Sequence, residues 1–220
     1  RRTGVAEMRG PRTLLPVSLL VVLLLGASAA NAQRAATGPP DWPCVQRLIP
    51  ELSWGTMWTG PSPEELEQDW RDDEETAEVV RYATARRTSQ SDAVARVDAF
   101  VRQVDNDREQ RLTLLFAGLF EEINRERSQT INAVRRFARG QVSRLEGISE
   151  LVDRLEQLRE QNDADPEELQ RVEDALFWER RVFEQRQQSL QAVCDQPYLL
   201  EERLSRLVHV VESELTPAAP

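Results

Sequence analysis

Two pairs of adjacent glutamates are the residues of this chain whose types and spacing could do chemistry. They are Glu121-Glu122 and Glu201-Glu202. Two carboxylates held together can act as general acid and general base, or can bind a cation. However, arginines follow each pair within a few positions, and charged residues at helical spacing usually form a solvated surface. We therefore expect solvated ion pairs here, formed with Arg125, Arg127, Arg203 and Arg206.

Motifs for other kinds of catalysis are missing from the sequence. It contains no glycine-rich phosphate loop, no Cys-x-x-Cys pair and no serine nucleophile motif. A zinc or di-iron site in a helical protein needs several histidines and carboxylates at helical spacing, and His209 is the only histidine. We therefore expect no catalytic residue, no metal site, no cofactor and no enzymatic activity.

Cys44 and Cys194 are the only cysteines of the chain. An even pair in an exported protein is most simply a disulfide, and we expect these two to be bonded. Closing a loop of about 150 residues would restrain the unfolded chain by about 4 to 5 kcal/mol on the entropic model. The bond would hold the N-terminal segment against the C-terminal half of the chain.

Residues 1–32 have the features of a secretory signal peptide. A short basic segment that begins at Met8 precedes the apolar run Leu14 to Leu25, and Ala-Asn-Ala follows before Gln33. The run of about 12 residues is shorter than the ~20 that span a bilayer. We expect translation to begin at Met8, so that residues 1–7 lie upstream, and we expect cleavage before Gln33. Retention of the segment as an anchor is the alternative, and the protein is expected to be periplasmic or secreted.

The charge of the chain excludes several kinds of partner. The whole chain has 28 basic and 38 acidic residues, and without residues 1–32 it has 24 and 37, a net charge of −13. A nucleic acid or an anionic membrane surface would be repelled. We expect no membrane span after cleavage of the signal segment.

The stretch from Asp107 to Leu215 predicts a long helical hairpin. Apolar residues recur at alternating three- and four-residue spacing on both sides of a turn at Asn162 to Pro166. If the turn is the fold point, antiparallel partners have residue numbers that add to one constant, and eight apolar pairs do so. These pairs are Leu112 with Leu215, Phe116 with Val211, Leu119 with Val208, Ile123 with Leu204, Val134 with Val193, Leu145 with Val182, Val152 with Ala175 and Leu155 with Val172. Val142 is also placed on the apolar face.

We therefore predict an all-α fold with a coiled-coil-like antiparallel hairpin, residues 107–215, inside a helical domain of residues 62–220. Each arm has roughly 50 residues and a length of about 75 Å. Helix-start signals at Ser62, Asp72 or Asp73, and Ser89 or Ser91 predict short helices that pack on one end of the hairpin. Pro197 should kink the second arm or restart it at Tyr198.

Residues 33–61, here called the strap, are rich in proline and tryptophan. Prolines at positions 43, 50 and 61 exclude a continuous helix, so we expect an irregular segment. Tryptophan is frequent at the centres of protein interfaces, which makes Trp42, Trp54, Trp58 and Trp70 a candidate interaction surface. Alternatively, the same tryptophans cover the core of a thin hairpin.

These features favour non-catalytic protein binding in the cell envelope, as a structural or adaptor component. The partner is expected to be a protein, and self-association into a homo-oligomer is left open. The first alternative is a periplasmic chaperone or holdase with helical prongs. The second alternative is a small-ligand sensor module, with the tryptophans as the wall of its pocket.

Overall fold

The computed structural model describes residues 38–215, and this part of the chain is helical with no strand. The all-α prediction is confirmed. The predicted signal peptide and its cleavage site lie outside the described residues. No helix within the described range is both long enough and apolar enough to cross a membrane.

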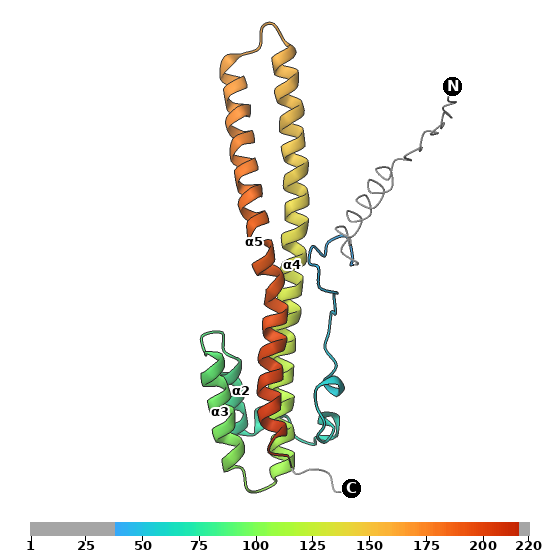
Figure 1. Cartoon of the computed structure of the whole chain (residues 1–220), viewed down its shortest axis with the longest axis vertical. Helices are drawn as coiled ribbons and strands as arrows, with labels where there is room; N and C mark the ends of the chain where they lie inside the picture. The colour runs from blue at the N-terminus through green and yellow to red at the C-terminus, as the bar shows by residue number, and fades with distance from the viewer. Residues whose placement is uncertain (1–37, 216–220) are drawn as a thin grey trace, which may run out of the picture. The chain divides into compact units, whose positions relative to one another are not determined.

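Two long helices form the predicted hairpin. Helix α4 spans Arg108–Glu160 and helix α5 spans Pro166–Glu212, and Figure 1 shows them side by side with the turn at one end. The side chain of Asp165 accepts a hydrogen bond of 2.9 Å from the backbone N–H of Glu167, and Pro166 occupies the first position of α5. Both features are typical of a helix start and explain why the chain reverses here.

Two short helices pack on the end of the hairpin away from the turn (Figure 1). Helix α2 spans Glu74–Thr84 and helix α3 spans Gln90–Gln103. The side chain of Asp73 accepts from the Thr76 N–H at 2.9 Å, and Ser89 accepts from the Asp92 N–H at 3.1 Å. Two of the predicted helix starts are thus confirmed by their caps, and with α4 and α5 these helices form a four-helix base.

The main hydrophobic core lies in this base. It joins the apolar faces of all four helices. Phe116 and Val211 are both fully buried in it, as are Leu119 with Val208 and Ile123 with Leu204. In this half of the hairpin the predicted partners therefore lie in one core, as the register required.

In the half of the hairpin near the turn, the prediction holds for Leu155 and Val172, which lie in one core, and is wrong for Leu145 and Ala175. Leu145 and Val142 are more than half exposed, and Ala175 is exposed while its neighbour Leu176 is buried. Ile148, Leu155, Leu169 and Val172 keep their predicted inward positions. The departure is therefore local, at the level where polar side chains meet between the arms.

A salt bridge takes the place of the predicted contact between Leu145 and Val182. Arg144 pairs with Glu179 between the arms, and Gln141 is buried one turn away. The Gln141 side-chain amide donates to the Phe183 carbonyl at 3.4 Å. Polar groups at this level leave the two-helix half of the hairpin with a smaller core, made mainly by Ile148, Leu155 and Leu176.

Of the two predicted effects of Pro197, the restart of the second arm at Tyr198 is wrong, and the kink stays a prediction. The helix is continuous from Pro166 to Glu212. A proline inside a helix removes one backbone hydrogen bond, but Pro197 is itself buried and lies one turn from the disulfide-bonded Cys194. Tertiary packing on both sides of the proline therefore holds the helix together.

The described part of the strap, residues 38–61, is irregular, as predicted, and Figure 1 shows it running along the hairpin on the side away from α2 and α3. The helical turn among these described residues is the 3-10 segment η2, Trp54–Thr56. Two more 3-10 turns, η3 at Pro63–Glu65 and η4 at Trp70–Asp72, connect it to α2. The predicted helix start at Ser62 therefore leads to one turn only.

Candidate functional site

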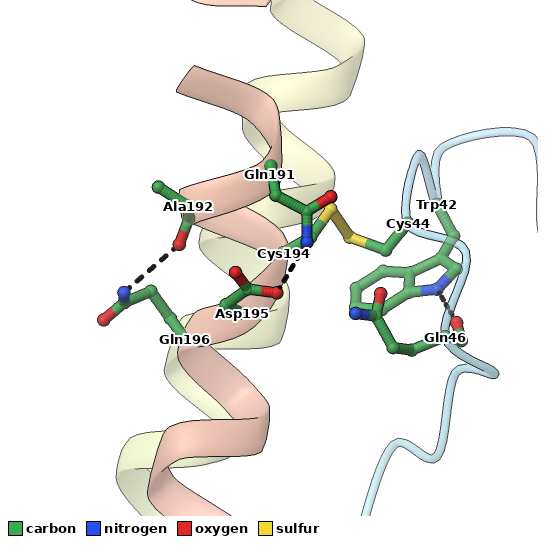
Figure 2. Close-up of a disulfide and its surroundings, with 8 residues drawn as sticks. All are labelled: Trp42, Cys44, Gln46, Gln191, Ala192, Cys194, Asp195 and Gln196. Carbon is green, nitrogen blue, oxygen red and sulfur yellow. Dashed lines mark hydrogen bonds between the residues drawn. A yellow bond between two sulfur atoms is a disulfide. The ribbon is translucent and has the colours of Figure 1, made fainter. Parts of the chain in front are cut away.

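The predicted disulfide between Cys44 and Cys194 is confirmed. The Cα atoms are 5.5 Å apart and both residues are buried. Figure 2 shows the bond joining the strap to α5, with the indole of Trp42 beside it. The indole N–H of Trp42 donates to the Gln46 carbonyl at 2.7 Å. The bond and the indole thus fix one end of the strap on the hairpin.

Three of the four candidate contact tryptophans are core residues. Trp42, Trp58 and Trp70 are only 4 to 6% exposed, and Trp54 is half-buried. The ring of Trp58 stacks on Phe116 with 4.2 Å between the ring centroids. These contacts favour the alternative in which the tryptophans cover the hairpin, and binding of a partner by them stays a prediction.

The four glutamates that could have formed a carboxylate site do not converge on one point. Glu121 accepts a hydrogen bond of 2.5 Å from Arg71 and one of 2.9 Å from the Trp70 indole. The bond from Arg71 holds the pKa of Glu121 below its usual value. The other ion pairs are Glu122 with Arg71 and Arg125, Glu201 with Arg127 and Glu202 with Arg206. Between residues 38 and 215 no group of three or more metal-binding side chains comes together.

Two of the arginines predicted to lie on a solvated surface do not. Arg127 is 3% exposed, donates to Glu201 at 2.6 Å and to the Pro50 carbonyl at 3.3 Å. Arg203 donates to the carbonyl of Ala83, in the last turn of α2, and to that of Thr88, in the connection to α3. Helical spacing could not show this, because the strap and α2 come from distant parts of the sequence and cover the arginine positions.

Two exposed aromatic side chains of the hairpin are neighbours in sequence and in space. Phe177 and Trp178 are 58% and 60% exposed, and their rings touch edge to face with centroids 5.3 Å apart. Neither residue belongs to the core between the arms. The sequence signal for this pair is two adjacent aromatic residues off the predicted seam.

A groove of about 580 Å³ lies beside Phe177, between α4 and α5. Its apolar walls are Val152, Leu155, Leu176 and Phe177, and its rim is formed by arginines and glutamates of both helices. Phe177 therefore stands at the edge of an apolar groove with a charged rim, an arrangement typical of protein contact surfaces. Phe177, Trp178 and this groove are called the hairpin surface below.

Similarity to known proteins adds no assignment to the hairpin surface or to the strap. The chain matches no protein-family model, no curated protein and no solved structure.

Proposed function

We propose that this protein is exported and acts without catalysis, by binding another protein as a structural or adaptor component of the cell envelope. Two features support export. The N-terminal segment has the order of a secretory signal, and the disulfide between Cys44 and Cys194 is of a kind that persists in oxidising compartments.

The exposure of Phe177 and Trp178 is the observation that carries the proposal of protein binding. The core of this half of the hairpin is complete without them. Two large aromatic rings in water are unfavourable for an isolated helix pair, since each buries 150 to 250 Å² when it is covered. Aromatic residues are enriched among the residues that dominate binding energy. Binding of a partner protein that covers this pair is therefore the function that the hairpin surface fits best.

The partner should present a basic surface with an apolar cavity. Residues 150–174, which form the hairpin end beside the aromatic pair, contain three arginines and ten acidic residues, a net charge of −7. A field of this sign attracts a cationic protein and accelerates its association. The aromatic rings would then enter the apolar cavity.

Capture of partners from the extracytoplasmic fraction of the native cells tests this function. The full chain should retain one basic protein in stoichiometric amount, and the double variant Phe177→Ala/Trp178→Ala should lose it. Tyr198→Ala is the matched control, because Tyr198 is equally exposed on the same helix but lies beside the strap. Retention of the partner by the double variant would contradict the proposal. Capture of many unrelated unfolded proteins would favour a holdase.

A further inference from the structure

A second groove, of about 910 Å³, lies in the base of the protein, where the connection between α2 and α3 meets α4 and α5. It is remote in sequence from the hairpin end, since its α5 residues lie between positions 196 and 206. The charged side chains that line it are Arg86, Arg136, Arg203, Arg206, Glu126 and Glu202.

The groove carries a positive charge in an acidic protein. Four arginines face two glutamates, a surplus of two positive charges, whereas the whole chain carries −10. The two glutamates are already paired. Glu126 accepts from Arg86 at 2.5 Å, and Glu202 pairs with Arg206. The surplus therefore belongs to Arg136 and Arg203.

Arg203 forms no ion pair with a carboxylate among residues 38–215. Its guanidinium donates from all three nitrogens to backbone carbonyls, twice to Ala83, at 2.5 and 3.1 Å, and also to Ala85 at 3.4 Å and Thr88 at 3.0 Å. These bonds fix its position, so that it acts on a ligand mainly through its charge. Burial lowers the pKa of Arg203, because removal of water disfavours the charged form, and Glu126 only partly offsets this. A desolvated guanidinium attracts anions more strongly than one in water.

Two further donors of this groove have no partner in the described part of the chain. Arg136 is exposed and makes neither an ion pair nor a hydrogen bond. The side-chain amide nitrogen of Gln90 is buried and has no acceptor. A buried donor without an acceptor is unfavourable, and a ligand oxygen would satisfy it.

We propose that this groove binds a small organic anion whose carboxylate or phosphate group pairs with Arg136 and is attracted by the fixed charge of Arg203. Guanidinium groups pair with both kinds of anion through parallel N–H···O bonds. Leu199 and Leu200 line the same groove, and Leu199 is half exposed. The apolar part of the ligand lies on these leucines. This binding is separate from the protein contact at the hairpin surface.

Calorimetric titration of the full chain with citrate and with pyrophosphate, at constant ionic strength, tests the proposal. Citrate represents carboxylates and pyrophosphate represents phosphates. At least one of them should bind saturably with a dissociation constant below about 1 mM. Arg136→Gln should weaken that binding about tenfold, the usual effect of one charge-assisted pair. Arg136→Glu should abolish it.

Arg181→Gln is the matched control, since it removes an exposed arginine that lies outside the groove. The affinity of this variant for the anion should stay within about twofold of the parent value. Circular dichroism should show the same helix content in all variants, because Arg136 makes no contact that the fold needs. Absence of saturable binding of both anions, or an equal loss in Arg136→Gln and Arg181→Gln, would overturn the proposal.

Discussion

The indole of Trp70 lies directly on Gly118 of α4. A Cβ atom on residue 118 would be 2.9 Å from Cδ2 of Trp70 and 2.7 Å from Cγ2 of Val80. Gly118 therefore lets the indole and α2 approach the backbone of α4 more closely than any other residue would. The Trp70 N–H then reaches Glu121, one turn further along the same helix.

Substitution of Gly118 by alanine should destabilise the protein by about 1 to 3 kcal/mol, because the added methyl group would clash with the buried side chains of Trp70 and Val80. Gly147→Ala, on the same helix, is the control. No atom lies within 4 Å of a Cβ at position 147, so alanine there should stabilise the helix by about 0.5 to 1 kcal/mol. Urea unfolding measures the change in the free energy of unfolding of each variant. A change of the same sign in both would contradict the packing of Trp70 on Gly118.

Removal of Glu201 should destabilise the protein more than removal of Arg127. Arg127 is buried whereas Glu201 is about one third exposed. Glu201→Ala leaves a buried charge without its partner and should cost about 3 kcal/mol, whereas Arg127→Met leaves a carboxylate that water can reach. Denaturant unfolding of the two variants tests this order, and a larger loss in Arg127→Met would show that the guanidinium is not desolvated.

The ion pair at the start of α2 should make stability depend on pH below neutrality. Burial alone would raise the pKa of Asp73, but hydrogen bonds from Arg111, at 3.0 Å, and from the Thr76 N–H outweigh it and lower the pKa. A lowered folded-state pKa means that the stabilisation is complete above the unfolded pKa of about 3.9 and is lost as the pH falls through the folded value.

Asp73→Asn keeps the cap but removes the charge, so it should cost about 1 to 2 kcal/mol at pH 7. The difference between this variant and the parent should shrink as the pH falls below the unfolded pKa of about 3.9, and it should vanish below the lowered folded-state pKa. Thermal unfolding across this range measures it. A difference that stays constant with pH would mean that Asp73 is not ionised in the folded protein.

The double variant Cys44→Ser/Cys194→Ser should lose about 2 to 4 kcal/mol, because a link across 150 residues no longer restrains the unfolded chain. The helix content should stay unchanged, since both arms keep their cores. Denaturant unfolding with far-UV circular dichroism measures both quantities. An unchanged unfolding midpoint would contradict the role of the bond in holding the strap.

Local patterns predicted those parts of the fold that depend on local chemistry. The turn at Asp165 and Pro166 and the cap at Asp73 follow from side-chain groups that act within three residues. The partners Phe116 and Val211 follow from a periodicity that needs no knowledge of other segments.

The buried state of Arg127 and the exposed state of Leu145 could not be predicted in this way. The first depends on the strap, whose Pro50 carbonyl reaches α4 from 77 residues away in sequence. The second depends on the pair formed by Arg144 and Glu179 between the arms, which a pattern of apolar residues cannot show. Composition alone likewise could not separate a core tryptophan from a contact tryptophan, and the structure buries Trp58 against Phe116.

Site-specific photo-crosslinking in the native cells tests most directly that the hairpin surface binds a protein. A photoreactive phenylalanine analogue replaces Trp178 in one strain and Tyr198 in a second, two positions of equal exposure on α5. Position 178 should form one discrete adduct with a basic envelope protein. The yield of this adduct should fall with added salt, because the hairpin end is acidic and salt screens its attraction to a basic partner. Position 198 should not form this adduct. No adduct at position 178, or the same adduct at both positions, would contradict the account.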